Sequence, residues 1–331
     1  MNSLDDPTVL LEALESVSGL EVEVDASLAR HSTFRIGGPA QFLIRVHEEA
    51  ALEAVLSVTA RLGVPFELLG LGSHVLFPDE GLPGVVALLV GRFADFEFQE
   101  DRVTAGGGVT LAKLARSASE KGLEGLEALS GIPSTVGGAV RMNAGSYGVE
   151  IKDVLVEAIV LERDGRRRRY GVEDLQPSYR STVLRGSQGV VARATFQLRE
   201  GNAEKAAAKI EELNRRRWAA LPSGSPNVGS IFRNPEGDYA GRLIEACNLK
   251  GAARGDAQIS PKHANVIVNN GGARASEVMD LMLVARRAVS DRFGVELVPE
   301  VELMGSLPVS YTHLTLPTIV RECRSRWSPG R

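Results

Sequence analysis

Cysteine is scarce in this sequence: Cys247 and Cys323 are the only two among 331 residues. Two cysteines cannot form a disulfide framework, and their spacing fits no zinc-binding pattern. We therefore expect a protein of a reducing compartment that holds no metal ion.

Long apolar runs and a surplus of positive charge are also missing. No run approaches the roughly 20 residues that a membrane-spanning helix needs, and the acidic segment 1–7 lacks the basic and apolar regions of a signal peptide. The chain has 38 Lys and Arg against 42 Asp and Glu. This balance disfavours nucleic-acid binding, because phosphate contacts need clustered basic residues. We expect a soluble cytoplasmic protein that binds neither membranes nor nucleic acid.

Glycine, by contrast, is abundant. The chain has 35 glycines, whereas average usage predicts about 23. They follow no Gly-X-Y period, so a collagen helix is excluded. We expect them to mark tight turns and places where the backbone approaches a ligand closely.

Hydrophobic periodicity predicts two α+β domains joined near residue 200. In the first, 1–200, we expect a βαβ unit over 42–69 and a hairpin around Asp164-Gly165. The other expected elements there are helices at 7–17 and 110–121 and strands at 84–90, 96–105 and 189–198. In the second, 201–308, we expect helices at 202–220, 240–248 and 275–293 and strands at 264–270 and 295–304. Segment 122–148 has little periodicity, which is typical of a segment that lies against a ligand.

The last 23 residues do not continue this pattern. Segment 309–331 begins VSYTHLTLPT, has no amphipathic period, and resembles the translation of a sequencing-library adapter. We interpret it as a non-native tail. A natural disordered tail is the alternative.

Three glycine-rich segments, 37–38, 70–73 and 131–148, are candidate binding loops. None is a GxGxxG that opens a helix after a strand, and no GxxxxGK[ST] occurs, so neither nucleotide fingerprint is supported. A loop such as 70–73, directly after a strand, can still point backbone N–H groups and the Ser73 hydroxyl at a pyrophosphate. Any one segment could be a plain turn, but three together favour a large phosphate-bearing cofactor.

A polar segment around Ser230 is the first candidate for chemistry. No His or Asp neighbours Ser230 in a hydrolase pattern, and GxSxG is absent. A catalytic Ser230 would therefore donate a proton rather than attack, and a surface or capping hydroxyl is the alternative. Arg233 and Asn234 could hold phosphate or amide groups.

Arg180 and Glu300 are the charged candidates. Arg180 could hold a carboxylate through two hydrogen bonds, or it could be a solvated loop residue. Glu300 lies in an apolar stretch, where burial would raise its pKa toward usefulness in acid–base chemistry. The alternative is a glutamate at a sheet edge that faces water.

The remaining basic residues have simpler interpretations. His263, after Lys262, could orient a ligand, but it could equally be a structural histidine. The runs 166–169 and 215–217 are interpreted as a solvated hairpin tip and a solvated helix face.

Taken in chain order, six segments resemble the UDP-N-acetylenolpyruvoylglucosamine reductase family. They are STFRIGG (32–38), GLGS (70–73), GIPSTVGGAVRMNAGSYG (131–148), PSYR (177–180), GSIFRNP (229–235) and PEVELMG (299–305). The resemblance covers nearly all of 20–305. It implies an FAD-binding domain of the vanillyl-alcohol-oxidase type over 1–200 and a smaller α+β domain for a UDP-sugar over 201–308. The short spacing from Arg180 to the helix at 202 suggests the class without a Tyr-bearing lid.

The resemblance also implies a reaction. NADPH reduces non-covalent FAD, which then reduces UDP-N-acetylglucosamine enolpyruvate to UDP-N-acetylmuramate, a cytoplasmic precursor of peptidoglycan. No nicotinamide fingerprint distinguishes NADPH from NADH. We expect a monomer. Another FAD-dependent oxidoreductase, or a flavin-binding module without catalysis, is the alternative.

Residue roles follow from the same resemblance. Arg180 and Glu300 stabilise the enolate, and Ser230 protonates it. The implied FAD-binding residues are Arg35, Gly70, Gly72, Ser73, His74, Gly131, Pro133, Ser134, Gly137, Gly138, Asn143, Gly145 and Tyr147. The implied substrate-binding residues are Tyr179, Arg233, Asn234, Lys262 and His263. The chain departs from the family at His74, where Asn is usual, and in loop 221–227, which lacks a lysine.

Overall fold

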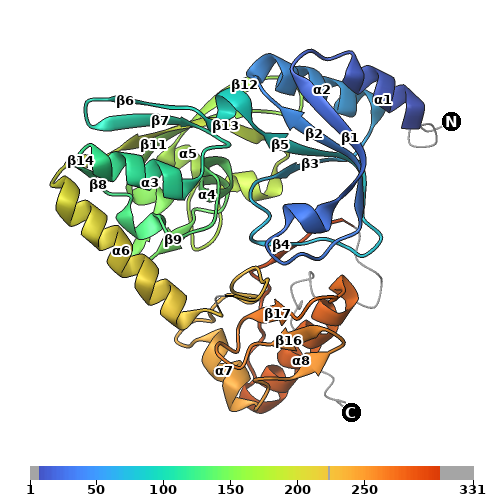
Figure 1. The fold of residues 1–331 in the computed structure, drawn as a ribbon, viewed down its shortest axis with the longest axis vertical. Helices are drawn as coiled ribbons and strands as arrows, with labels where there is room; N and C mark the ends of the chain where they lie inside the picture. Colours follow the sequence, from blue (N-terminus) through green and yellow to red (C-terminus); the bar gives the residue numbers. More distant parts are fainter. Residues whose placement is uncertain (1–6, 223, 306–331) are drawn as a thin grey trace, which may run out of the picture.

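The computed structural model describes residues 7–222 and 224–305, which form three lobes (Figure 1). The segment interpreted as a tail, 309–331, lies outside these residues. Within the described part of the chain, no helix is long and apolar enough to cross a membrane. The same residues contain no cluster of His, Cys, Asp and Glu side chains that could hold a metal ion.

The first lobe is a four-stranded sheet with the strand order β1-β2-β5-β3. Its strands are β1 (Leu20–Ser27), β2 (Pro39–Val46), β5 (Leu82–Leu89) and β3 (Phe66–Leu69). Helices α1 (Pro7–Glu15) and α2 (Glu49–Leu62) bury their apolar residues against one face of the sheet. The predicted βαβ unit is confirmed, because β2 and β3 are both parallel to β5, which lies between them.

The second lobe is a five-stranded antiparallel sheet with the order β12-β11-β13-β7-β6. Its strands are β12 (Arg167–Gly171), β11 (Leu155–Leu161), β13 (Val190–Gln197), β7 (Arg102–Gly106) and β6 (Phe96–Gln99). The hairpin predicted around 164–165 is confirmed. The single strand predicted over 96–105 is wrong: the chain turns at Glu100, which has a φ of 55°, and forms two strands.

The chain between β7 and β11 packs against this second sheet. Helices α3 (Leu111–Glu120) and α4 (Val136–Arg141) share one apolar core with β7, β11 and β13. Thr110 and Thr135 cap these helices, because each side chain accepts a hydrogen bond from the first helical turn. The short elements nearby are β8 (Leu123–Glu124), η3 (Glu127–Leu129), β9 (Gly145–Ser146), β10 (Val149–Glu150), η4 (Ile151–Asp153), α5 (Val172–Leu175), η5 (Val183–Gly186) and β14 (Arg199–Glu200).

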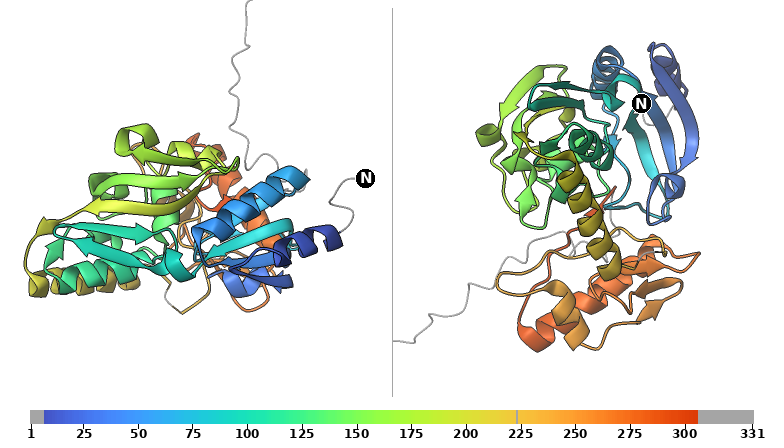
Figure 2. Two further views of the ribbon diagram at one scale, coloured as in Figure 1. Left: turned by 90° about the horizontal axis from the view of Figure 1, so that it is seen from above. Right: turned by 60° about the vertical axis from the view of Figure 1, so that its left-hand side comes forward.

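Helix α6 (Ala203–Ala220) leads from the second lobe to the third (Figures 1 and 2). The third lobe contains α7 (Ala240–Ala246), α8 (Ala275–Phe293) and a small sheet of β15 (Ala253–Arg254), β16 (Ala257–Ile259) and β17 (Ile267–Asn269). The prediction for α8 is confirmed at both ends. Its apolar residues form the core of this lobe, and Gly294 ends it in a left-handed conformation with a φ of 65°.

The end of the described chain returns to the first lobe. The strand predicted over 295–304 is largely wrong, since only β18 (Glu302–Leu303) is a strand. It pairs in parallel with β4 (Val75–Leu76), directly after loop 70–74. Before it, Pro299 forms an isolated bridge with Phe232. Glu300 therefore lies between Pro299, which pairs with Phe232, and β18, which pairs with the first lobe. The short helices η1 (Leu28–His31) and η2 (Gly91–Ala94) complete the fold.

Candidate active site

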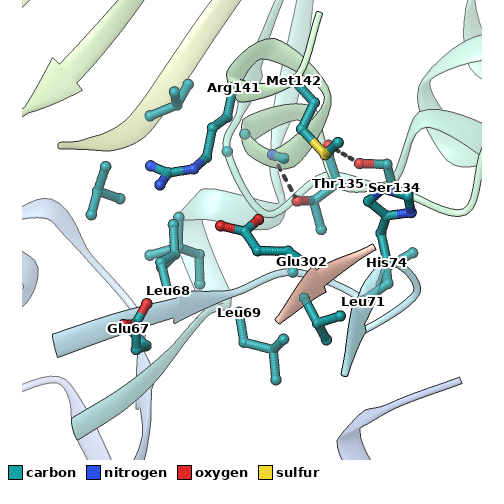
Figure 3. A pocket seen from close by; sticks show the side chains of 18 of the residues that line it. Glu67, Leu68, Leu69, Leu71, His74, Ser134, Thr135, Arg141, Met142 and Glu302 are labelled. Carbon is teal, nitrogen blue, oxygen red and sulfur yellow. Dashed lines mark hydrogen bonds between the residues drawn. The ribbon is translucent and has the colours of Figure 1, made fainter. Parts of the chain in front are cut away.

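A cavity of about 510 Å³ lies between the sheets of the first two lobes (Figure 3). One wall consists of β3 and loop 70–74, and the opposite wall of Gly107–Gly108, segment 134–142 and segment 185–191. Glu302 and Met304 of the returning chain close one side. The glycine-rich segments 70–73 and 131–148 therefore meet across this cavity, as their common interpretation requires.

Loop 70–74 has the geometry of an anion-binding loop. The backbone N–H groups of Leu71, Gly72, Ser73 and His74 have no acceptor among the described residues. Consecutive free N–H groups of this kind form a nest for a phosphate. Gly72 has a φ of 59°, and a Cβ atom there would overlap the carbonyl oxygen of His31. The tight turn therefore depends on glycine at this position.

His74 gives a second sign that a polar ligand belongs here. Its ring lines the cavity beside Ser134 (Figure 3), and its Nε2 atom is buried without a hydrogen-bond partner. Leaving such an atom unpaired costs about 1–3 kcal/mol. A ligand with an oxygen at this point would supply the missing partner. The donors present fit a phosphate-bearing cofactor such as FAD.

The opposite wall is held by residues that sequence reasoning missed. Thr135 caps α4 by accepting a hydrogen bond from the N–H of Gly138 at 3.3 Å. Arg141 donates hydrogen bonds to the carbonyl oxygens of Ser187 (3.0 Å) and Arg185 (3.1 Å). The arginine thereby attaches segment 185–189 to α4. The consecutive glycines at 106–108 are a sequence signal for this wall, because Gly107 and Gly108 line it.

Two carboxylates, Glu67 and Glu302, also line the cavity. In Figure 3 the Glu302 side chain projects into it from β18. Burial raises the pKa of Glu67 above its ordinary value, and the negative charge of Glu302 raises it further. The positive charges of Arg141 and Arg163 oppose this shift.

Arg180 and Glu300 form an ion pair outside the residues that line this cavity, although Arg185 and Glu302, close to each of them in the chain, do line it. The Nε atom of Arg180 donates a 2.9 Å hydrogen bond to Oε1 of Glu300, and the two side chains are 23% and 11% exposed. The alternatives of a solvated arginine and a water-facing glutamate are therefore wrong. Arg185, which lines the cavity, donates to the carbonyl oxygen of Arg180 at 3.1 Å. Tyr179 lies with its ring 5.2 Å from the Arg180 guanidinium.

The segment that follows Ser230 is held next to Glu300. The N–H of Glu300 donates to the carbonyl oxygen of Ile231 at 2.7 Å. On the other side, buried Asn265 brackets Phe232: its Oδ1 accepts from the Phe232 N–H at 3.0 Å and its Nδ2 donates to the Phe232 carbonyl at 2.8 Å. Ser230 is thus fixed close to the ion pair. Asn265 was missed, although a polar residue in the apolar run 264–268 was a signal for it.

The geometry agrees with the comparisons with known proteins. Residues 221–304 match the family model "UDP-N-acetylenolpyruvoylglucosamine reductase, C-terminal domain", and residues 40–171 match the model "FAD binding domain". A curated UDP-N-acetylenolpyruvoylglucosamine reductase 2 from Symbiobacterium thermophilum is 45% identical over 284 residues, which cover 85% of this chain and 91% of that protein. The reductase from Bacillus velezensis is 39% identical over 279 residues, which cover 84% and 92%.

The chain belongs to the UDP-N-acetylenolpyruvoylglucosamine reductase family. The crystal structure of the Thermus caldophilus reductase matches it with a TM-score of 0.74 at 36% identity, over 86% of this chain and 99% of that one. The expected fold class, an FAD-binding domain followed by a smaller α+β domain, is confirmed. Helix α6 lies outside both family models.

Seven of the residues that the family resemblance assigns to FAD line the cavity, and six do not. Those that line it are Gly70, Gly72, Ser73, His74, Ser134, Gly137 and Gly138. Those that do not are Arg35, Gly131, Pro133, Asn143, Gly145 and Tyr147. Arg35 lines two neighbouring cavities instead. Pro133 accepts a hydrogen bond from the Ser73 hydroxyl.

Asn143 acts within its own segment. Its Nδ2 donates to Glu150 Oε2 at 3.0 Å and to the Ser178 carbonyl at 3.1 Å, and its Oδ1 accepts from the Lys152 N–H at 3.0 Å. The side chain is buried, so it fixes the shape of segment 143–152. Its contact with FAD stays a prediction, as does that of every other residue assigned to FAD.

Apart from Tyr179, which lies beside Arg180 in the second lobe, the residues assigned to the substrate are distributed over the third lobe. Arg233 has a buried Nε atom without a partner. Asn234 is exposed, and its Oδ1 accepts from the N–H of Ala240 at the start of α7. Lys262 donates to the carbonyl oxygens at 218 and 221, so it holds the end of α6. His263 accepts a hydrogen bond from the Asn265 N–H, and burial lowers its pKa.

Proposed function

We propose that this protein reduces the enolpyruvyl group of UDP-N-acetylglucosamine enolpyruvate to give UDP-N-acetylmuramate, with bound FAD and with NADPH as the reductant. The observation that carries the proposal is the Arg180–Glu300 ion pair, which is hydrogen-bonded to the segment after Ser230 and to Arg185 of a cavity that fits FAD. Residues 1–200 would hold the cofactor and residues 201–308 the substrate. We propose a cytoplasmic monomer that makes a precursor of peptidoglycan.

Loop 70–74 would hold the FAD diphosphate, because its free N–H groups and the unpaired Nε2 atom of His74 belong to residues that line the same cavity. When bound, FAD supplies the hydride that adds to the terminal carbon of the enolpyruvyl group. Gly137 and Gly138 have no side chains, so a planar ring system can approach the backbone of α4 at these two positions of the opposite wall.

Arg180 is oriented for a carboxylate. Its Nε atom is used by Glu300, which leaves the terminal nitrogens of the guanidinium for the carboxylate of the substrate. Arginine binds carboxylates through such parallel hydrogen bonds. Negative charge that develops beside this carboxylate during the reaction is then stabilised by a fixed cation in a water-poor site.

Ser230 would donate the proton that completes the reduction. No described residue forms a hydrogen bond with its side chain, so the hydroxyl is available for the substrate. Serine is a weak acid, and it can protonate only a strongly basic carbon such as the one this reaction generates. The buried, unpaired Nε of Arg233, three residues on, would face the UDP-sugar.

Two measurements on the purified protein test this function. A flavin absorbance spectrum should show bound FAD, and NADPH oxidation should depend on the UDP-enolpyruvyl sugar. Absence of flavin would overturn the whole proposal. Bound flavin with no turnover of this sugar would favour another oxidoreductase on the same scaffold. Size-exclusion chromatography with light scattering should give the mass of a monomer.

A further inference from the structure

Arg217 does not lie on the solvated helix face where its sequence predicted it. It occupies the last turn of α6, the helix that joins the second and third lobes (Figure 1). Arg215 and Arg216 are exposed as expected, whereas Arg217 is half-buried. Its Cδ atom lies 3.2 Å from the position that a Cβ atom on Gly131 would take. The side chain therefore turns inward against segment 131–148.

The charge of Arg217 has no counter-ion among the described residues. Its guanidinium forms no hydrogen bond and no ion pair with any residue in 7–222 and 224–305. Burial lowers its pKa, the phenol of Tyr147 opposes that shift, and the positive charge of Arg180 adds to it. Arg180 itself pairs with Glu300. The carboxylate of Glu300 therefore pairs with Arg180 alone, and Arg217 is left without one.

The surroundings of Arg217 connect it to the ion pair. Tyr147 donates from its hydroxyl to the carbonyl oxygen of Leu213, one turn earlier on α6, at 3.1 Å. Two residues before Tyr147, the Cβ position of Gly145 lies 3.4 Å from Nη1 of Arg180. Residues 145–147 therefore contact Arg180 at one end and helix α6, which carries Arg217, at the other. Glycine at 131 and 145 keeps both approaches free of side chains.

We propose that Arg217 determines ligand affinity by binding a phosphate group of a nucleotide next to Arg180. This inference rests on the proposed function, in which Arg180 takes the substrate carboxylate and so leaves Arg217 for a different anion. Phosphate oxygens suit a guanidinium fork because they accept two parallel hydrogen bonds. They come from two sources in this reaction, the diphosphate of the UDP-sugar and the phosphates of NADPH.

A purely structural role would leave a different signature. An arginine that stabilises the fold is paired, and its removal lowers the stability of the unliganded protein. An unpaired, half-buried guanidinium instead costs free energy until an anion binds to it. Removal of Arg217 should therefore not lower the melting temperature of the flavin-loaded enzyme without nucleotide. It should shrink the rise in that temperature that the nucleotide causes.

The test compares Arg217→Gln with Arg216→Gln, each in the flavin-loaded enzyme. Arg216 is a matched control, since it is adjacent, exposed, and ion-paired to Glu212 on the surface of the same helix. For Arg217→Gln we expect the KM of one nucleotide to rise roughly 10- to 100-fold, the effect of losing charge-assisted hydrogen bonds, with kcat and flavin content little changed. Arg217→Lys should give an intermediate KM, because it keeps the charge and loses the fork.

Separate titrations identify which phosphate is bound. Weaker binding of UDP to Arg217→Gln, with NADP⁺ unaffected, assigns the contact to the diphosphate. Weaker binding of NADP⁺ relative to NAD⁺, with UDP unaffected, assigns it to the dinucleotide. Unchanged affinity for both overturns the proposal, as does a loss of stability that is equal with and without nucleotide.

Two further outcomes keep the test decisive. If Arg217→Gln is not recovered in a folded form, Arg217→Lys carries the comparison, and an unchanged KM in that variant overturns the proposal. Failure of the proposed function is seen separately, in the unmodified enzyme, as missing flavin or missing turnover of the UDP-enolpyruvyl sugar.

Discussion

Arg180 and Glu300 are separated by 120 positions in the chain, yet the Nε atom of Arg180 donates a 2.9 Å hydrogen bond to Oε1 of Glu300. The pair joins the loop after the hairpin of the second lobe to the segment that returns to the first lobe. Arg180 has a φ of 56°, a conformation that costs about 1–3 kcal/mol in a non-glycine residue. Despite that cost, the hydrogen bonds that Arg180 makes with Glu300 and Arg185 hold its backbone and its guanidinium group in place.

Replacement of Glu300 tests what this pair contributes. We expect Glu300→Gln to lower sugar-dependent turnover by about 10²- to 10³-fold, the usual effect of removing one group that stabilises developing charge. Reduction of the flavin by NADPH should persist. Stopped-flow measurement of the two half-reactions separates these steps. Glu236→Gln, at an exposed position, is the control, and equal loss in both half-reactions would contradict the assigned role.

Removal of the Ser230 hydroxyl affects a different part of the same reaction. In Ser230→Ala the flavin should still be reduced by NADPH, while reduction of the sugar collapses because no group remains to protonate its second carbon. Rapid-mixing absorbance at the flavin band reports both steps. If the reduced flavin of the variant is still reoxidised by the sugar at the normal rate, Ser230 is not the proton donor.

The elements that the sequence predicted well are those with strong local signals. Helix α8 has a continuous apolar face and Gly294 directly after its last residue, so both of its ends were predicted. The hairpin of β6 and β7 was missed because the chain turns at Glu100 with a positive φ, a conformation for which glycine is the usual signal. The run 295–304 looks like one strand, but only two of its residues find a partner strand, at β4.

The residues of the site also differ in how well the sequence predicts them. Loops 70–74 and 131–148 were recognisable because each needs glycine at fixed positions of one continuous segment. Arg141 and Asn265 were not, because each acts through contacts with segments more than thirty residues away. Arg217 was assigned to solvent because its run of arginines is typical of a helix surface. Only the packing of α6 against Gly131 distinguishes it from its neighbours.

Asn265 should be important for both stability and turnover. Asn265→Ala leaves the N–H and the carbonyl oxygen of Phe232 buried without partners, at a cost of about 1–3 kcal/mol for each group. Urea unfolding monitored by circular dichroism measures this loss of free energy. Turnover should fall as well, because the segment that carries Ser230 loses one of its supports. The exposed Asn270 provides the control, Asn270→Ala, and equal stability of the two variants would contradict this account.

The turn at Gly72 should depend on a close approach rather than on backbone conformation alone. Gly72 and Gly148 both have positive φ values, of 59° and 83°, but a Cβ atom would overlap the His31 carbonyl only at Gly72 and would meet nothing within 4 Å at Gly148. Both alanine variants bear the conformational cost of about 1 kcal/mol or more. Gly72→Ala should in addition lose bound flavin, measured by the absorbance ratio of the purified protein, whereas Gly148→Ala should retain it.

Glu67 should make the stability of the enzyme depend on pH. Its pKa in the folded protein is raised above the ordinary 4.5, chiefly by burial and then by the charge of Glu302. The unfolded chain therefore releases the Glu67 proton at a lower pH than the folded protein does. Because the folded state binds more protons over this range, stability falls as pH rises from 4.5 through the raised pKa.

Glu67→Gln removes this titration and keeps the size of the side chain. The variant should match the unmodified enzyme near pH 4 and melt at a higher temperature at a pH above the raised pKa, where Glu67 carries its buried charge. Differential scanning calorimetry across this range measures the difference, and Glu53→Gln, exposed on α2, is the control. Glu302→Gln should shift the same transition partway, because it removes one of the two causes. A melting difference that is constant with pH would mean that Glu67 affects stability through packing rather than through its charge.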